Sequence, residues 1–546
     1  MSNSLMNTAM SGINAAQVAM SVVANNIANS KNADYNRQTT VLTQNNGTMT
    51  SAGFVGNGVV VNSINREYSE FITKLHNEEQ TKHAALKSYN EQINKINNLL
   101  ADRDTSLSNS IGEFFKNMKR VEGGAEDSAA RTTVLDTAKV LVSRFKSAGD
   151  SLRQIDGSIN DQIEQNVRDI NNYAEEIAKL NNEITRMRGM GTGEPLALLD
   201  KRDEAVNRLN QLIEVNVVQQ DRGIYNVSFG GGMTLVSGNK SYRLEAIPSS
   251  TDSGRITLGY NNGVAGTKEI DERFISQGAL GGALQVRRGV VDSTRNELNQ
   301  LALVMADQFN QVQNGGFDLD GEKGVDFFSF TNPEVVANGK NKGSAGFTVE
   351  YADTTKVKAS NYTLKFEGGD WEVQRASDNA MIPVKKNGDT LEFDGLKVKI
   401  DSAKAENHDN YMLKTVSNVV TSLEVNLKNT NQLATSDAKN SGQSNNNNAK
   451  KFLALQDKLL VDGKASFAGG YASLVSKVGS AANKVQVDLE AQGHIVKQIN
   501  SDRQSISGVN MDEEYGELQR LQQYYLANAR VIQTATTLFD AILNIR

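Results

Sequence analysis

The feature that most constrains this chain is an apolar stripe in its last residues, from Met511 to Arg546. Apolar residues recur there at alternating steps of three and four, which is the a/d seam of a coiled coil. The seam positions are Met511, Glu514, Leu518, Leu521, Tyr525, Asn528, Ile532, Ala535, Phe539 and Ile542. A second line repeats every seven residues beside the seam, at Tyr524, Val531, Leu538 and Ile545. A helix with so wide an apolar face must bury it, so the stripe predicts a helical partner.

We predict that this partner is a helix over residues 4–28, which has the same spacing. Its main line is Met6, Met10, Ile13, Gln17, Met20, Ala24 and Ile27, and an adjacent line is Leu5, Ala9, Gly12, Ala16, Ala19 and Val23. The stretch has no charged face, and Gly12 weakens it as an isolated helix, so we expect it to order late, against partners. An ordinary N-terminal core helix is the alternative reading. Asn528, a polar residue at a d position, is the candidate for fixing the register of the pair.

Composition excludes several classes of function. The net charge is −6 and the pI is about 5.6, with Lys and Arg spread along the chain, so neither nucleic acid nor an anionic membrane is an expected partner. No run of eighteen apolar residues predicts a membrane span. The N-terminal stretch lacks the pattern of a secretory signal, and its first charged side chain is Lys31. The absence of Cys excludes disulfides and thiol chemistry.

The middle of the chain alternates between helical and strand-like patterns. Helical periods are predicted over residues 68–100, 111–121, 129–152, 159–187, 196–213, 285–313 and 468–501, with a further helix from about Val416. Short strands are expected near residues 39–43, 59–61, 215–260 and 317–413. The polar tract Asn440–Asn448 predicts a mobile loop.

This order predicts a mixed α and β, elongated multidomain protein in which the chain leaves along an axis and returns beside itself. The expected parts are a terminal helical coiled coil, a long-helix bundle with β parts, and an all-β insert. Their predicted bounds are 1–45 plus 505–546, 46–330 plus 415–504, and 331–414.

The residues that could carry chemistry have simpler explanations. Asp200, Asp203 and Glu204 near a helix start are expected to cap it and to pair with Lys201 and Arg202. Residues 317–326 lack the ligand spacing of a calcium loop and predict an Asp/Gly turn. His76 and His83 lie seven residues apart, too far to share a metal without a third element. We therefore expect no catalytic, cofactor or metal site and no enzyme activity.

Several motifs resemble those of a known family. The run Ala24-Asn-Asn-Ile-Ala-Asn29 followed by Tyr35-Asn-Arg-Gln38 resembles the N-terminal signature of bacterial flagellar axial proteins, although Ala33-Asp34 stands where the family usually has Pro-Gly. Further stretches narrow the resemblance to the hook-associated protein 1 family: Phe114-Phe115, Ala129-Ala-Arg131, Leu199-Asp-Lys-Arg-Asp203, Gly278-Ala-Leu-Gly-Gly-Ala-Leu284 with Arg287, Ser505–Glu514, Gln533-Thr-Ala535 and Leu543-Asn-Ile545.

The resemblance implies a structural adaptor that forms a ring between the hook and the filament through paired terminal helices. It implies hook protein, a second hook–filament junction protein and further copies of the chain as partners. It also implies export by the flagellar type III apparatus to an extracellular flagellum, with a chaperone on the C-terminal helix. The implied assembly residues are Met6, Met10, Ile13, Met20, Ile27, Leu518, Leu521, Tyr525, Asn528, Ile532, Phe539 and Ile542, and the implied chaperone-binding residues are Tyr524, Val531, Leu538 and Ile545.

Two other functions remain open from the sequence. One is another axial protein, either hook protein or the second junction protein. The other is a secreted peptidoglycan hydrolase carried on an axial scaffold, which would require a catalytic carboxylate pair within residues 214–414.

Overall fold

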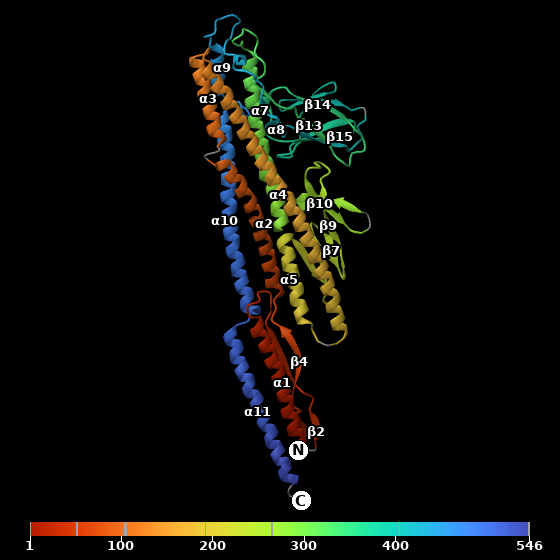
Figure 1. Ribbon diagram of the computed structural model, residues 1–546. Helices are drawn as coiled ribbons and strands as arrows, with labels where there is room; N and C mark the ends of the chain where they lie inside the picture. Colours follow the sequence, from red (N-terminus) through yellow and green to blue (C-terminus); the bar gives the residue numbers. More distant parts are fainter. Residues whose placement is uncertain are drawn as a thin grey trace.

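The chain forms a rod with a side branch, and its two ends lie together at one end of the rod (Figure 1). The computed structural model describes residues 2–50, 53–102, 106–191, 193–263, 266–402 and 404–543. Helices α1 (Ser2–Asn29) and α11 (Met511–Leu543) form the base of the rod. The chain therefore leaves along an axis and returns beside itself, as the nested sequence pattern predicts.

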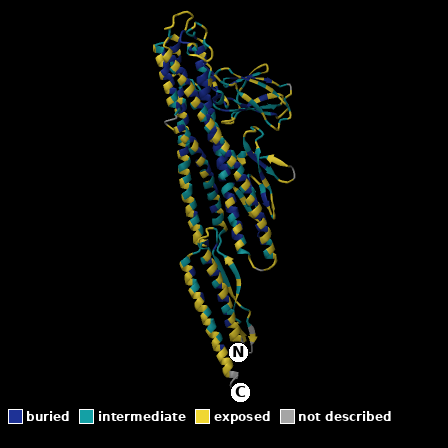
Figure 2. Ribbon diagram, in the orientation of Figure 1, coloured by how far each residue is buried: buried dark blue, intermediate teal, exposed yellow. Residues whose placement is uncertain are grey.

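A bundle of long helices forms the middle of the rod. Its members are α2 (Glu70–Ala101), α3 (Leu107–Gly123), α4 (Ser128–Gly189), α5 (Leu196–Leu212), α6 (Gly278–Val286), α7 (Asp292–Asn314) and α10 (Phe467–Ser507). The buried residues concentrate in this bundle, whereas α1 and α11 are mostly exposed or intermediate (Figure 2). The core of the described residues thus lies in the bundle, up to the end opposite the termini, and the base formed by α1 and α11 contributes little to it.

Helix α4 joins two predicted helices into one. It begins with the side chain of Asp127, which accepts a hydrogen bond from the Ala129 amide, and it continues through Gly157, around which there is open space. The predicted isoleucine heptads lie on its buried face, at Ile159, Ile163, Ile170, Ile177 and Ile184. The heptad prediction is therefore confirmed, and only the break near residue 155 is wrong.

The predicted Gly-rich motif at residues 278–284 allows two helices to approach closely. Helix α6 packs on α2, and a Cβ on Gly282 would lie 2.1 Å from the carbonyl oxygen of Ala85. A π-helical turn over Arg287–Val291 joins α6 to α7, and the buried Arg287 side chain donates to the Ile256 carbonyl at 2.8 Å. The glycines of this motif therefore serve the close packing of α6 on α2.

Two small antiparallel sheets lie along one side of the bundle. The first has the order β5-β6-β7-β8 and the second the order β11-β10-β9. Their strands are β5 (Val215–Gln219), β6 (Tyr225–Phe229), β7 (Met233–Ser237), β8 (Lys240–Ser241), β9 (Arg243–Pro248), β10 (Ile256–Asn261) and β11 (Thr267–Glu269).

The side branch is the predicted all-β insert. It consists of two four-stranded antiparallel sheets, in the orders β13-β20-β15-β16 and β14-β19-β18-β17. Trp371 lies in its core, with ring centroids 5.4 Å from Phe347 and 5.1 Å from Phe366. The strands are β13 (Glu334–Ala337), β14 (Gly346–Tyr351), β15 (Tyr362–Glu367), β16 (Asp370–Arg375), β17 (Lys385–Asn387), β18 (Thr390–Phe393), β19 (Leu396–Asp401) and β20 (Asn410–Lys414).

The helix predicted from about Val416 is wrong. Only the single turn α8 (Val419–Ser422) is helical there, and β21 (Glu424–Val425) then pairs with β12 (Phe328–Ser329). The fully buried Arg131 explains the irregular path that follows, because its guanidinium donates to the Thr430 and Leu433 carbonyls and to the Thr435 hydroxyl. Those carbonyls would be bonded within a helix if one formed.

The polar tract Asn440–Asn448 is tied down by its own amides. The buried Asn448 side chain donates to the Val312 and Ala434 carbonyls, at 2.9 and 2.8 Å, and Asn446 donates to Glu122. The tract leads directly into α9 (Asn447–Ala454). The sequence predicts a mobile loop here because the tract is polar, but the side-chain amides of the tract bind backbone carbonyls of neighbouring segments.

A two-stranded ribbon runs along α1. Strands β1 (Gln38–Gln44) and β4 (Val59–Arg66) pair antiparallel, and the short hairpin β2 (Thr48–Thr50) and β3 (Gly53–Val55) extends between them toward the base of the rod (Figure 1). The Val59 amide donates to the Ser11 hydroxyl of α1 at 3.1 Å. The expected domain boundary at residue 45 therefore falls inside this ribbon, and the strands up to Arg66 lie with the terminal helices.

Candidate assembly interface

Helices α1 and α11 pack side by side and antiparallel over most of their length (Figure 1). In the half of this pair nearer the bundle, Ala19, Val23 and Leu521 form a small buried cluster, to which Met20, Ile27 and Leu518 add partly buried side chains. On α11 the predicted seam is the inward face. Glu514, Leu521 and Ala535 are buried, and Leu518, Tyr525, Asn528 and Ile532 are half-buried.

On α1 the seam differs from the predicted main line. Met6 and Met10 are exposed, at 40% and 47% of their surface, and the packed positions belong to the adjacent line of small residues. Those buried positions are Ala9, Gly12, Ala16, Ala19 and Val23. Ile13, Met20 and Ile27 flank them and are half-buried. Small side chains are selected because they let the two helix backbones approach closely, which a line of Met residues would prevent.

Gly12 and Asn528, the expected register residue, face each other across the pair. A Cβ on Gly12 would lie 2.5 Å from Oδ1 of Asn528, so the Asn528 side chain fills the space that Gly12 leaves empty. Asn528 also donates through Nδ2 to the Tyr524 carbonyl at 2.9 Å, which holds its side chain in place. A slip of one heptad would move Asn528 against Leu5 or Ala19, where a side chain occupies that space.

The predicted seam extends beyond its partner at the base of the rod. Phe539 is 46% exposed, because in the register of Gly12 with Asn528 it lies past the first residue of α1. The second line of α11 is exposed too, at Tyr524, Val531 and Leu538. The Ile542 side chain and Ile545 lie outside the described parts of the structure.

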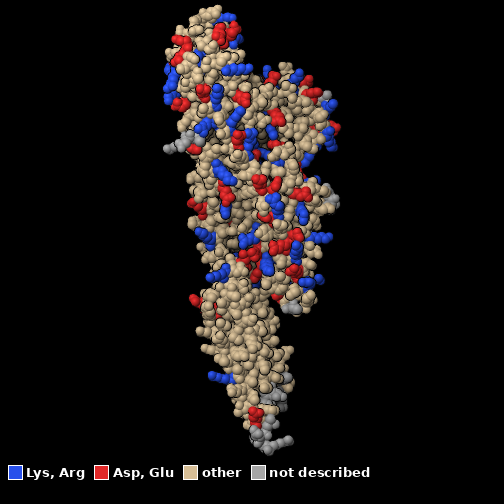
Figure 3. Space-filling view, in the orientation of Figure 1, with Lys and Arg blue, Asp and Glu red and all other residues tan. Residues whose placement is uncertain are grey.

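The base of the rod combines exposed apolar side chains with few charges. Helix α1 contains no charged residue, and Figure 3 shows only scattered charged side chains on the visible face of this region, in contrast with the middle. Large exposed apolar residues here are Leu5, Met6, Met10, Val18, Met49, Phe54, Val60, Tyr524, Leu526, Val531, Leu538 and Phe539. Exposed apolar surface of this extent marks an interaction site.

The N-terminal signature forms a cluster of hydrogen bonds at the end of the terminal pair nearer the bundle, and we call this cluster the polar knot. The buried Asn26 side chain donates to the Gln38 carbonyl at 2.9 Å and accepts from the Gln38 amide at 3.0 Å, which pairs α1 with the start of β1. The Tyr35 hydroxyl donates to Oδ1 of Asn26 at 2.8 Å. Burial, and then the charges of Asp200 and Glu514, raise the pKa of Tyr35 to about 12, so the hydroxyl stays a donor at neutral pH.

Glu514 connects this knot to α11. Its side chain is 1% exposed, and its two carboxylate oxygens accept from Nδ2 of Asn26 at 3.0 Å and from Nε of Arg37 at 2.7 Å. The Arg37 amide donates to the carbonyl of Ser507, the last residue of α10, at 2.8 Å. One buried carboxylate at a predicted seam position thus joins both terminal helices and the loop between α1 and β1.

A second set of charges connects the knot to the middle bundle. Nδ2 of Asn36 donates to Oδ1 of Asp200 at 2.6 Å, and Arg66 lies 3.0 Å from Asp200 and 2.7 Å from Asp203. The expectation that Asp200 and Asp203 only cap α5 and pair with Lys201 and Arg202 is therefore wrong. Their partners come from the signature loop and from β4, more than 130 residues away, which no local pattern indicates.

The Arg202 side chain of the same motif is buried as well. It lies over the ring of Tyr225, 3.5 Å from its centroid, and donates to Asn181 and to the Gly223 carbonyl. Burial raises the pKa of Tyr225 to about 12, to which the charge of Asp203 contributes. The Leu-Asp-Lys-Arg-Asp motif thus anchors the terminal pair on the bundle through Asp200 and the β5–β6 connection through Arg202.

His76 of α2 is buried beside this junction. Burial lowers the pKa of His76, the charge of Arg503 lowers it further, and Asp34 opposes the shift. Unfolded His titrates near pH 6.5. Because the folded-state pKa is the lower one, the stability that neutral His76 contributes is present above about pH 6.5 and is lost as the pH falls through the folded-state pKa.

We therefore expect the free energy of unfolding to fall more between pH 7 and pH 5 in the parent protein than in His76→Gln, measured by urea denaturation. Gln keeps a polar group at this position and does not titrate. Identical pH profiles for the two proteins would show that His76 does not carry this dependence.

The acidic and histidine side chains of the described residues form no metal-binding group. Within them, no group of three or more His, Asp or Glu side chains could hold a metal ion. Asp318 accepts from the amides of Asp320 and Glu322, and Gly321 has a φ of +75°, so residues 317–326 form the predicted Asp/Gly turn. In the same part of the chain, no helix is long and apolar enough to cross a bilayer.

This geometry defines a class of protein, an elongated structural subunit. Its two terminal helices form a pair with an exposed apolar surface, and hydrogen bonds and ion pairs connect the pair to a rod of helices. Comparisons with known proteins identify the family. A profile described as the helical domain of flagellar hook-associated protein FlgK matches residues 93–328, and one described as the D2-like domain of flagellar hook-associated protein 1 matches residues 336–415. Profiles of flagellar basal body rod proteins match residues 6–30 and 501–545.

Whole-chain comparisons agree with these matches. The chain is 45% identical to flagellar hook-associated protein 1 of Salmonella typhimurium and 42% identical to that of Escherichia coli K12, with 100% of each chain covered. The chain belongs to the flagellar hook-associated protein 1 family. The fold also matches the flagellar hook junction protein FlgK of Burkholderia pseudomallei, with a TM-score of 0.74, 23% identity, and coverage of 79% of this chain and 100% of that one. The chain is therefore a hook-associated structural component of the bacterial flagellum.

Proposed function

We propose that this protein is the adaptor that joins hook to filament, and that its copies form a ring through the terminal helix pair. The observation that carries the proposal is the exposed apolar surface on α1, on α11 and on the ribbon beside them, in which α1 has no charged residue. Burying one Leu, Met or Phe side chain contributes about 1.5–3 kcal/mol, so a few such contacts per neighbour are enough to hold a subunit.

The proposed partners are hook protein on one side of the ring and a second junction protein on the other, with further copies of the chain between them. Export by the flagellar type III apparatus would carry the chain to the extracellular flagellum. The protein acts without catalysis in this proposal. We place residues 1–66 and 505–546 in the inner part of the ring, the helical bundle with its small sheets in the middle, and residues 331–414 on the outside.

Complementation tests the adaptor role. A non-motile strain of a flagellated bacterium from which hook-associated protein 1 has been deleted is expected to regain filaments and motility when it expresses this chain. Strains that lack hook protein or the second junction protein are expected to stay non-motile. Restoration in either of these strains instead would support the other axial roles, and cleared zones on a peptidoglycan zymogram would support the hydrolase.

We further propose that an export chaperone binds the exposed second line of α11 before assembly. Tyr524, Val531 and Leu538 are exposed and lie on one helical face at seven-residue spacing, which suits a groove-forming partner; Ile545 continues the line in sequence. Changing Val531 and Leu538 to Ser is expected to weaken binding of the purified flagellar chaperone at least about tenfold by calorimetry. Binding unchanged by the double substitution would remove this face from the chaperone site.

A further inference from the structure

The outer insert contacts the rest of the described chain at several places, among them α7, the connection from α9 to α10, and the turn between β9 and β10, beside which Lys340 also pairs with Glu269 of β11. Gln300 of α7 donates to the buried Val357 carbonyl, and Lys358 forms an ion pair with Asp462 in the connection from α9 to α10. The third contact is the turn between β9 and β10. There the Gly339 amide donates to the Ser250 carbonyl at 2.8 Å, and Lys414 lies 3.2 Å from Asp252.

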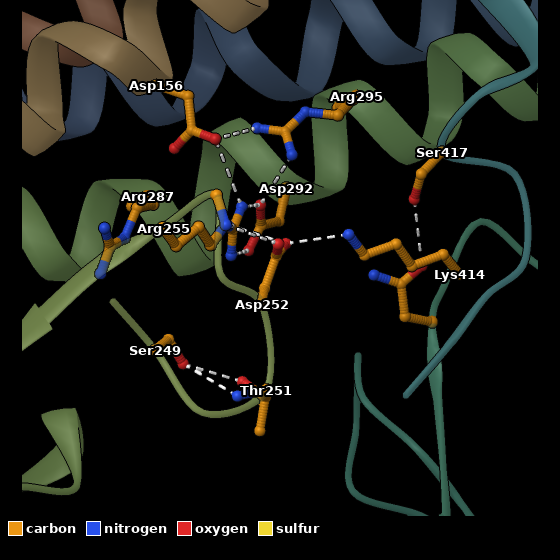
Figure 4. A network of polar contacts seen from close by, with 12 residues as sticks. Asp156, Ser249, Thr251, Asp252, Arg255, Arg287, Asp292, Arg295, Lys414 and Ser417 are labelled. Atoms are coloured by element: carbon orange, nitrogen blue, oxygen red, sulfur yellow. Dashed lines mark hydrogen bonds and ion pairs between the residues drawn. The ribbon is translucent and has the colours of Figure 1, made fainter. Parts of the chain in front are cut away.

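A cluster of charges holds the β9–β10 turn against α4 and α7 (Figure 4). Arg255 donates through Nη1 to Oδ2 of Asp292 at 2.9 Å and makes a second bond to the other oxygen of the same carboxylate. The Arg255 guanidinium also lies 3.7 Å from the carboxylate of Asp156 of α4. The Arg255 amide donates to the Asp252 carbonyl at 2.9 Å, which closes the turn. Arg295 of α7 provides a second cation to Asp156, at 2.7 Å.

The charges in this cluster balance. Three carboxylates, from Asp156, Asp252 and Asp292, face three cations, from Arg255, Arg295 and Lys414. Every one of these side chains is between 15% and 27% exposed, so each is partly desolvated. Removing one cation from such a cluster leaves carboxylates that repel one another in a medium of low polarity.

We propose that Arg255 is a positioning residue that sets the orientation of the outer insert relative to the helical rod. Arg255 holds the β9–β10 turn against α4 and α7. The same turn contacts the insert, because Asp252 pairs with Lys414 and the Ser250 carbonyl accepts from the Gly339 amide. Interfaces between parts of one chain are mobile by default. Here the cluster makes the insert and the rod move as one body.

Spin-label distances test this inference on the full-length monomer, so the result does not depend on ring formation. The chain has no Cys, and Glu176→Cys on α4 with Asn387→Cys on β17 places two labels at exposed positions, one on each part. The parent pair is expected to give one narrow distance distribution. Arg255→Ala is expected to shift its mean or to broaden it about twofold, and Arg255→Lys to restore part of the narrow distribution.

Two further variants separate positioning from loss of folding. Lys414→Ala removes the ion pair between the insert and Asp252 and leaves the contacts of Arg255 with Asp292 and Asp156 in place, and it is expected to broaden the distribution as well. Arg273→Ala removes an exposed pair of the same chemistry, with Asp271, and is expected to leave the distribution unchanged. A parent-like distribution in both Arg255→Ala and Lys414→Ala would overturn the inference, as would equal broadening by Arg273→Ala.

Discussion

Replacing Glu514 by Ala should release the terminal helix pair from its polar knot. The substitution removes the acceptor for both Asn26 and Arg37, and it leaves the amide of Asn26 buried without this partner. Losing a buried charged acceptor costs about 2–3 kcal/mol, at the lower end here because Arg37 is partly exposed to water. In the halves of α1 and α11 that lie toward the base of the rod, we expect backbone amides to exchange hydrogen about 30- to 100-fold faster than in the parent protein.

Hydrogen exchange measured by mass spectrometry is the right readout, because global unfolding reports mainly on the helical bundle. Glu513→Ala is the matched control: Glu513 is the adjacent carboxylate, 3.6 Å from Arg37 and 60% exposed, and its loss should change stability by no more than about 0.5 kcal/mol. Glu514→Gln should lie between the two, because its amide oxygen still accepts from Asn26. Equal exchange in Glu514→Ala and Glu513→Ala would contradict the role of the knot.

Replacing Gly12 by Ala should weaken the pair although Ala is the better helix former. Ala gains about 1 kcal/mol in helix propensity over Gly. The added methyl group, however, would lie 2.5 Å from Oδ1 of Asn528, and overpacking of this kind costs about 1–3 kcal/mol. We expect a net loss of about 1 kcal/mol, seen as roughly fivefold faster exchange in α1.

A double substitution tests whether the contact with Asn528 is the cause. Combining Gly12→Ala with Asn528→Ala removes the obstacle and should restore slow exchange to at least the level of Asn528→Ala alone. Gly157→Ala is the control, because Gly157 lies in α4 with open space around it and its replacement should only stabilise the helix. Slower exchange in Gly12→Ala alone would show that propensity, and not packing, dominates at this position.

The helices of this chain were predictable because their apolar spacing is local. The α11 seam and the heptads of α4 follow directly from residues three and four apart. The predicted seam of α1 lies one position away from the observed one. Hydrophobicity favours Met6 and Met10, whereas close packing against α11 buries the smaller residues Ala9 and Gly12. Hydrophobicity predicts that a face is buried, and side-chain size decides which one.

The polar knot could not be predicted, because its partners are distant in the sequence. Asn26 and Glu514 are separated by 488 positions, and Asn36 and Asp200 by 164. The only available signal was that several polar motifs resembled family signatures, without any indication that they contact one another. The same holds for the insert, where alternation predicted strands such as β15 and β19 but not that they belong to different sheets. Contacts between distant segments depend on the whole topology and leave no local pattern.

Disulfide mapping in isolated flagella tests most directly whether the terminal pair joins neighbouring copies. Met10 lies two residues before Gly12, and Val531 three residues after Asn528, so the two exposed side chains lie at similar heights on different helices. Since the chain has no Cys, a variant with Met10→Cys and Val531→Cys can form bridges only through these positions. Met6→Cys with Leu538→Cys probes positions nearer the base, six residues before Gly12 and ten residues after Asn528.

If the exposed face of α1 in one copy meets the exposed face of α11 in the next, a double variant should form a ladder of covalent oligomers under oxidation, and the single variants should form none. This is the result that the ring predicts. Absence of a ladder in both double variants, or efficient dimers from Met10→Cys alone, would contradict assembly through the terminal helix pair.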